Sequence, residues 1–181
     1  MAHSIAVDEN LELRLLQEED ADELFAVAEK NRAELERWVP SWAHATTSLD
    51  ACRSVIRHSL QRHAVGSGRV LGIRSDHHLV GLLGLSVTAP WEGEIGYWLG
   101  VEHRGRGIAT RCVQAFTDYV FDSQRLSVLR IVCDPQNLPA CAIPERLGFE
   151  LQSAVSDSPD ESSLPRTYVM TPERWTCRGF R

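Results

Sequence analysis

The feature that most constrains the fold is a series of three strand-like segments with no helix between them. Residues 69–75, 78–88 and 93–100 are rich in Val, Ile and Leu, and the polar turn "SDHH" joins the first two. Strands that follow one another through short turns pair as antiparallel hairpins. Later strand-like segments at 128–134 and 149–154 instead follow predicted helices, as crossover connections do. The order of elements therefore predicts a mixed α/β sheet and not a repeating βαβ fold.

The remaining segments complete this pattern. Helical spacing of apolar residues predicts about four helices, at 20–37, 49–65, 108–122 and 138–148. Ser48 or Asp50 is expected to cap the second of them. Alternating runs predict further strands at 11–16 and 166–171, which gives six to seven strands, and the polar stretch 156–165 is typical of a surface loop. At 181 residues, the chain is expected to form a single domain over 1–181.

Composition narrows the class of protein. A net charge of −6 argues against a broad nucleic-acid-binding surface. No segment approaches the roughly 18–20 apolar residues of a membrane span, and the first residues lack the pattern of a secretory signal. Five cysteines, none in a C-x-x-C pair, favour reduced thiols in the cytoplasm. The seven histidines show no metal-ligand spacing. We therefore expect a cytoplasmic protein that binds neither nucleic acid nor membrane and holds no metal.

The glycine-rich stretch "RGRG" at 104–107 lies between a predicted strand and a predicted helix. The start of a helix has unpaired N–H groups and the positive end of the helix dipole. Gly105 and Gly107 let a ligand approach the backbone closely, and Arg104 and Arg106 add positive charge. The stretch therefore predicts a binding site for phosphate, and particularly for a pyrophosphate.

Two common phosphate-binding motifs do not match this stretch. A nucleotide P-loop requires G-x-x-x-x-G-K followed by Ser or Thr, which is absent from the sequence. The dinucleotide fingerprint G-x-G-x-x-G would place a third glycine at position 110, where the chain has Thr110. Asp134 ends the following strand as a ribose-binding acid could, but the preceding helices and antiparallel strands are unlike a Rossmann unit. Dinucleotide binding stays the weaker alternative.

The sequence "RGRGIA" at 104–109 matches the Gln/Arg-x-x-Gly-x-Gly/Ala signature of the GNAT acyltransferases. The blocks "EIGYWLGVEHRGRGIAT", "PERLGF", "LERWVPSW" and the terminal "PERW" resemble more particularly the ribosomal-protein N-terminal acetyltransferases of that superfamily. The resemblance covers about residues 11–175. It implies a mostly antiparallel twisted sheet in which the strand ending at Leu99 splays from its neighbour and leaves a V-shaped gap. It also implies acetyl-coenzyme A as the cosubstrate and no metal.

In this family the gap holds pantetheine against free backbone groups of the splayed strand, much as an added strand pairs with a sheet edge. An N–H of that strand could also polarise the thioester carbonyl. The resemblance implies these cofactor-binding residues: Trp98, Leu99, Arg104, Gly105, Arg106, Gly107, Ile108, Ala109, Thr110 and Asn137.

Acetylation of an amine also requires proton transfers. Glu94, on the strand that leads to the loop, is where relatives place a base, with Glu92 as the substitute. Relatives often have N-x-x-S after the next strand, but here Asn137 is followed by Ala140 in the serine position. Cys141 and Tyr168 could replace that serine as proton donor. No base is evident beside Cys141, so direct attack in a ternary complex is favoured over an acyl-enzyme.

The acceptor remains open between two kinds of amine. Trp38 and Trp42, around Pro40, could form a wall of the acceptor site or cover the core at a helix end. The resemblance favours a protein N-terminal amine, and a small amine such as a polyamine, an antibiotic or an amino-acid derivative is the alternative. Because Ala140 replaces the serine, a non-catalytic acyl-coenzyme A-binding protein is an alternative of another class. Relatives are often dimers, so a homodimer is a further expectation.

Overall fold

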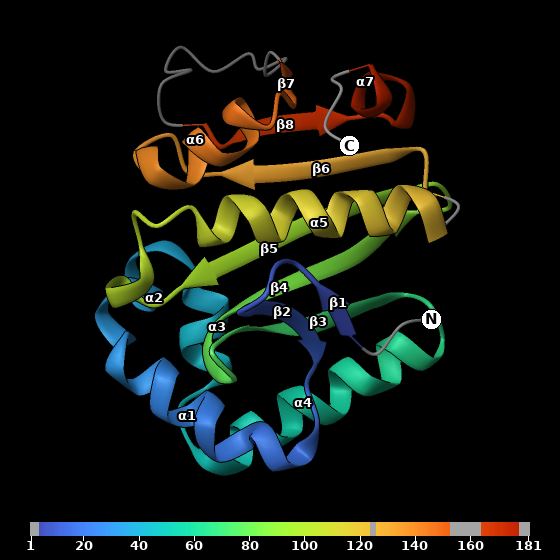
Figure 1. Cartoon of the computed structure of the whole chain (residues 1–181). Helices are drawn as coiled ribbons and strands as arrows, with labels where there is room; N and C mark the ends of the chain where they lie inside the picture. The colour runs from blue at the N-terminus through green and yellow to red at the C-terminus, as the bar shows by residue number, and fades with distance from the viewer. Residues whose placement is uncertain (1–3, 124–125, 153–163, 178–181) are drawn as a thin grey trace.

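The computed structural model describes residues 4–123, 126–152 and 164–177 of the chain. Within these residues, eight strands form one sheet in the order β1-β2-β3-β4-β5-β6-β8-β7 (Figure 1). The strands are β1 (Ser4–Ala6), β2 (Leu11–Leu15), β3 (Gly68–Ser75), β4 (His78–Ala89), β5 (Glu92–Leu99), β6 (Val128–Cys133), β7 (Glu150–Gln152) and β8 (Arg166–Met170). Every neighbouring pair is antiparallel except β5 and β6. The predicted mixed, mostly antiparallel sheet is confirmed.

The central hairpins form where the sequence predicts them. Asp76 and His77 connect β3 to β4 with φ angles of 49° and 68°, in the left-handed region that tight two-residue hairpin turns require. Asp and His are among the residues that tolerate this conformation best. The turn fixes the register of β3 against β4, and through β4 it fixes the position of β5.

The helices are more numerous than predicted. The described residues form α1 (Ala21–Lys30), α2 (Arg32–Trp38), α3 (Pro40–Ala45), α4 (Leu49–Ala64), α5 (Ile108–Ser123), α6 (Leu138–Arg146) and α7 (Pro172–Thr176), with short 3₁₀ turns η1 (Glu18–Asp20) and η2 (Val101–His103). Helix α4 begins after Ser48, whose hydroxyl accepts a hydrogen bond from the Ala51 N–H, as the capping pattern predicts. Most of the predicted loop 156–165 lies outside the described residues.

The helix predicted over 20–37 is divided at Asn31. The Asn31 side chain donates to the carbonyl of Val27 at 2.8 Å and accepts from the N–H of Val101 at 2.9 Å. Asn competes in this way with helical backbone hydrogen bonds. The break therefore arises from a contact with a residue 70 positions away, which local periodicity does not reveal.

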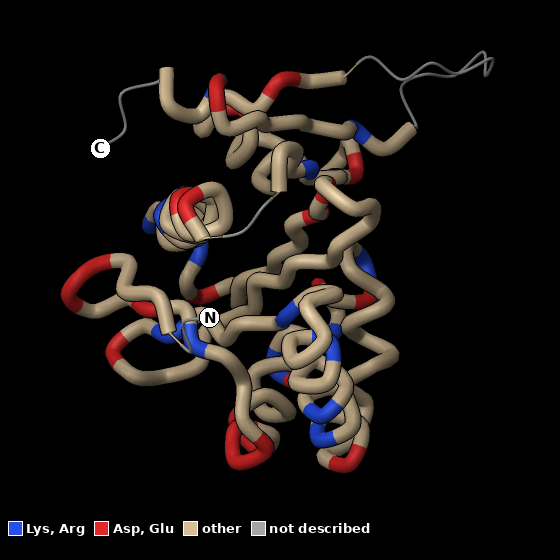
Figure 2. The backbone as a smooth tube through the Cα atoms, turned by 90° about the vertical axis from the view of Figure 1, so that its right-hand side faces the viewer, with Lys and Arg blue, Asp and Glu red and all other residues tan. Residues whose placement is uncertain are grey.

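The helices cover both faces of the sheet and produce two apolar cores. Helices α5 and α6 pack on one face, where Phe116 and Val113 are fully buried. Helices α1 to α4 pack on the other face around Leu24 and Ile56. Most charged residues lie on the helices and turns at the periphery (Figure 2). The two helical layers thus stand on opposite sides of β5, the strand that leads to the glycine loop.

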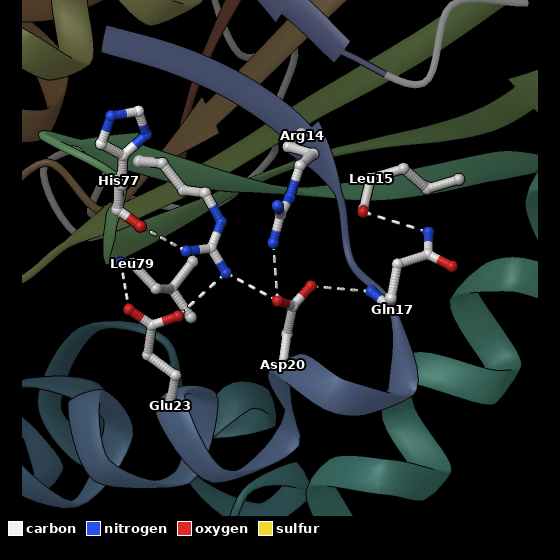
Figure 3. Close-up of polar contacts among 8 residues, drawn as sticks. Arg14, Leu15, Gln17, Asp20, Glu23, His77 and Leu79 are labelled. Atoms are coloured by element: carbon white, nitrogen blue, oxygen red, sulfur yellow. Dashed lines mark hydrogen bonds and ion pairs between the residues drawn. The ribbon is translucent and has the colours of Figure 1, made fainter. Parts of the chain in front are cut away.

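A buried ion network fixes α1 to the sheet (Figure 3). Asp20 accepts hydrogen bonds from the guanidinium groups of Arg14 at 2.8 Å and Arg74 at 2.7 Å. Arg74 also contacts Glu23 at 2.9 Å and donates to the carbonyl of His77 at 2.6 Å. Because Arg74 and Asp20 are both buried, each needs the other as counter-charge. The network joins η1 and α1 to β2 and to the β3–β4 turn.

Candidate active site

The sheet opens between β5 and β6. These strands pair in parallel over Glu92–Glu94 of β5, and the following residues of β5, up to Leu99, pair with β4 alone among the described strands. The two strands diverge in Figure 1, which confirms the predicted V-shaped gap. The gap leads into a cavity of about 560 Å³ that is lined by Asn31 and α2, the end of β5, the glycine loop, α5 and α6.

The glycine loop lies at one end of this cavity. Gly105 and Gly107 have φ angles of +75° and +71°, where other residues are strained. A Cβ added at Gly105 would meet no heavy atom within 4 Å, whereas one at Gly107 would come within 3.1 Å of Nη1 of Arg111. Five of the residues predicted to bind coenzyme A line the cavity at this end: Gly105, Gly107, Ile108, Ala109 and Thr110. Arg106 is exposed and lies outside the lining.

Two further arginines and a histidine line the same cavity. Arg111, one turn into α5, contacts Asp8 at 3.0 Å and donates to the carbonyl of Arg106. Arg146 of α6 donates to the hydroxyl of Thr110 at 3.0 Å, and His103 completes the lining. None of these three was predicted. The spacing from Gly107 to Arg111 is one helical turn and could have revealed Arg111, but Arg146 reaches the site only through the packing of α6.

The side chain of Arg104 points toward α2. Its Nη1 is 2.7 Å from a carboxylate oxygen of Glu34, and its Nε donates to the carbonyl of Leu99 at 3.4 Å. The hydrogen bond from Arg104 to Glu34 is the main cause that lowers the pKa of Glu34, against a smaller opposing effect of burial. Arg104 therefore connects the glycine loop to the helix on the opposite wall of the cavity.

The arrangement of these residues fits a pyrophosphate ligand. Gly105 and Gly107 both have positive φ angles, and three arginines and His103 line the same cavity. The N-terminal N–H groups of the 16-residue helix α5 lie beside it. Trp98, Leu99 and Asn137 also line the cavity, so the predicted binding residues other than Arg106 lie together. Asn137 in addition caps α6, because its side chain accepts from the Ala140 N–H.

The two predicted proton donors lie in a buried cluster outside the cavity lining. The Cys141 thiol donates to the carbonyl of Asp134 at 3.4 Å, and the Tyr168 hydroxyl donates to Glu145 at 2.7 Å. Burial raises the pKa of Tyr168, and burial with the neighbouring Cys141 raises the pKa of the Cys133 thiol to about 12.

A phenol that the sequence analysis missed does line the cavity. Tyr97 lies on β5, and its hydroxyl donates to the carbonyl of Ala140 at 2.9 Å. Burial raises the pKa of Tyr97 well above its usual value, so the hydroxyl stays protonated at neutral pH. Its position on β5, one residue before Trp98, is the only sequence signal for it.

The remaining predicted residues lie in different places. Glu94 is exposed and stands at the apex of the V, as the last β5 residue paired with β6. Trp38, at the end of α2, lines the cavity opposite the glycine loop. Trp42, on α3, lines a separate cavity of about 340 Å³ between α3, α4 and β3. Trp38 and Trp42 are therefore not two parts of one wall.

Two further properties concern the described part of the chain. No group of three or more His, Cys, Asp or Glu side chains lies together there in a way that could hold a metal ion. No helix there is both long and apolar enough to cross a membrane.

Comparisons with known proteins agree with this geometry. Residues 10–150 match the model of the acetyltransferase (GNAT) domain. YdaF of Bacillus subtilis, named as a candidate ribosomal N-acetyltransferase, is 31% identical over 146 residues, which cover 79% of each chain. The ribosomal-protein-serine acetyltransferase of Escherichia coli is 26% identical over 160 residues, or 87% of this chain and 89% of that protein.

Solved structures show the same fold. RimL, a ribosomal L7/L12 alpha-N-protein acetyltransferase solved with coenzyme A, superposes with a TM-score of 0.84 at 23% identity, over 93% of this chain and 97% of RimL. The microcin C7 self-immunity acetyltransferase MccE, solved with acetyl-CoA and AMP, has the same TM-score at 20% identity and covers 94% and 97% of the two chains. The chain belongs to the GNAT family and is an acetyl-coenzyme A-dependent N-acetyltransferase.

Proposed function

We propose that this enzyme acetylates the α-amine of a protein N-terminus. The observation that carries the proposal is the form of the cavity, which runs from the glycine loop to α2 past the end of β5, where the edge toward β6 has no strand partner among the described residues. One end suits the pyrophosphate, and we assign the acceptor amine to the other end, at α2. Two similar proteins support a ribosomal-protein acceptor. The Escherichia coli relative is named a ribosomal-protein-serine acetyltransferase, and RimL is named a ribosomal L7/L12 alpha-N-protein acetyltransferase.

The chain's own residues supply binding and orientation. The backbone at Gly105–Gly107 and the start of α5 would hold the pyrophosphate, and the free edge of β5 near Trp98 and Leu99 would pair with pantetheine. Acetyl-coenzyme A supplies the thioester as acyl donor. A backbone N–H of the same edge can polarise the carbonyl under attack. Fixing both reactants in one cavity provides a large share of the rate by proximity.

Direct attack by the amine fits the positions of the cysteines. Cys141 lies outside the cavity lining and its thiol is bonded to a backbone carbonyl, so it is poorly placed to become an acyl-enzyme. Tyr97 is the phenol that lines the cavity, and its protonated hydroxyl would have to leave the carbonyl of Ala140 to donate a proton to the leaving thiolate. The role of Cys141 or Tyr168 as proton donor stays a prediction. It would require a proton to pass from the buried cluster into the cavity.

The role of Glu94 as base predicts a specific pH dependence. Glu94→Gln is expected to slow acetylation most at low pH, where the acceptor is an ammonium and its proton must be removed. The measurement is kcat/KM against pH. Glu92→Gln is the matched comparison, because the Glu92 carboxylate is paired with Arg130 at 3.0 Å and should be less able to take a proton. An unaltered profile in the Glu94 variant would remove Glu94 from the mechanism.

Acceptor preference tests the proposed function. We expect a peptide with a free N-terminal Ser or Ala to have a higher kcat/KM than polyamines, aminoglycosides or amino-acid amides. The control is the same peptide with a blocked N-terminus and an internal lysine, which should not be acetylated. A small amine that reacts faster than every peptide would contradict the proposal and favour a small-molecule acetyltransferase. A cytoplasmic location, a homodimer and a domain over 1–181 remain predictions that accompany this function.

A further inference from the structure

Charge is unevenly distributed in the cavity. Four basic or imidazole side chains come from the loop after β5, α5 and α6, namely His103, Arg104, Arg111 and Arg146. The opposite wall, from Asn31 to Val39, contributes one carboxylate, Glu34, which is the only carboxylate among the described lining residues. An amine that enters from this wall as an ammonium would have to leave water, which is costly without a counter-charge.

The surroundings of Glu34 suit an ammonium ion. The side chain is 33% exposed, so it is partly shielded and still reachable. Trp38 lies one helical turn further along α2 and lines the same cavity, and its ring already holds a cation, because the guanidinium carbon of Arg37 lies 4.5 Å from the ring centroid. The hydrogen bond from Arg104 lowers the pKa of Glu34, so the carboxylate is ionised in the free protein. In the free protein its charge is balanced by Arg104 at 2.7 Å.

We propose that Glu34 is a specificity-determining residue that binds the protonated amine of the acceptor, and that Arg104 occupies this position until the cosubstrate is bound. The inference rests on the proposed function and names the residue that selects its acceptor. Arg104 belongs to the loop that faces the pyrophosphate, so a bound pyrophosphate offers its guanidinium a second anionic partner. Release of Glu34 would then couple binding of acetyl-coenzyme A to binding of the amine.

Other contacts allow this exchange without detaching α2 from the loop. Lys30 and Glu102 form an ion pair at 2.6 Å, and Asn31 accepts from the N–H of Val101. These two contacts join the α1–α2 junction to the segment after β5 independently of Glu34. Loss of the Glu34 charge should therefore leave the walls of the cavity in place.

The test compares Glu34→Gln with Glu36→Gln, an exposed change on the same helix outside the cavity lining. For the Glu34 variant we expect KM for the acceptor to rise about tenfold, as the loss of one charge-assisted hydrogen bond predicts. The kcat should fall by less than the KM rises, because Glu34 binds the ammonium before its proton is removed and takes no part in the later transfer of the acetyl group. Glu34→Asp should recover part of the affinity. The Glu36 variant should match the wild type.

Two results would overturn the inference. One is an unchanged acceptor KM in Glu34→Gln. The other is a weaker Kd for acetyl-coenzyme A with an unchanged acceptor KM, which would assign Glu34 to holding Arg104 alone. The assay uses both an N-terminal peptide and a small primary amine. If only the small amine is acetylated, the proposed function fails, while the effect of Glu34 is still measured on that amine.

Discussion

Replacement of Gly107 by glutamate is expected to abolish binding of acetyl-coenzyme A. Gly107 has a φ angle of +71° and lies where the loop joins α5. A glutamate there would place a carboxylate at the loop that we propose to hold the pyrophosphate, and like charges in one site repel strongly. We expect the Kd, measured by calorimetry, to weaken by at least about a hundredfold, which corresponds to about 2.7 kcal/mol.

The control places the same residue at a positive-φ glycine outside the cavity. Gly66 has a φ angle of +73°, and a Cβ added there would meet no heavy atom within 4 Å. It follows α4 and lies outside the cavity lining. Gly66→Glu therefore carries a similar strain of about 1–2 kcal/mol and should leave the Kd unchanged. Folded Gly107→Glu protein with wild-type affinity would refute the assignment of the loop.

Replacement of Asp20 by alanine is expected to lower the free energy of unfolding by about 3 kcal/mol. Asp20 accepts hydrogen bonds from Arg14, Arg74 and the N–H of Gln17. Its removal leaves the buried Arg74 guanidinium with Glu23 and a backbone carbonyl as partners. Loss of one partner of a buried pair is costly because the other charge stays out of water. Urea unfolding followed by circular dichroism measures the change.

The matched comparison is an exposed ion pair. Arg53 contacts Asp50 at 3.1 Å on the surface of α4, where Asp50 is 92% exposed. Arg53→Ala should lower the free energy of unfolding by about 0.5 kcal/mol or less, because water already solvates both charges. Equal losses in the two variants would show that the Asp20 network does not fasten α1 to the sheet.

Much of the fold could be predicted from local sequence patterns. The hairpins of β3, β4 and β5, the helix after the glycine loop and the cap at Ser48 depend on neighbouring residues, and all were predicted. The division at Asn31 was not predicted, because it depends on the N–H of Val101. The short strand β1 was also missed, since three residues carry too little periodicity to distinguish them from a loop.

The site was predictable where backbone conformation defines it. Glycines between a strand and a helix predicted a loop that does line the cavity, and Gly105 and Gly107 both adopt positive φ angles. The acceptor wall was less accessible to prediction, because Glu34 is one of several acidic residues on a helix and resembles a solvated face. Cys141 and Tyr168 were predicted to lie at the gap. The packing of α6 on β8 instead buries both side chains outside the cavity lining. Such packing follows from tertiary contacts that spacing does not encode.

The central claim is that the cavity between β5 and β6 binds acetyl-coenzyme A. Its most direct test is thermal unfolding of the whole chain with acetyl-coenzyme A, NAD or ATP, each added at about a hundred times a micromolar affinity. Binding at that excess should raise the free energy of unfolding by about 2.7 kcal/mol. We predict this stabilisation with acetyl-coenzyme A alone. No stabilisation by acetyl-coenzyme A, or stabilisation by NAD in its place, would contradict the assignment of the cavity.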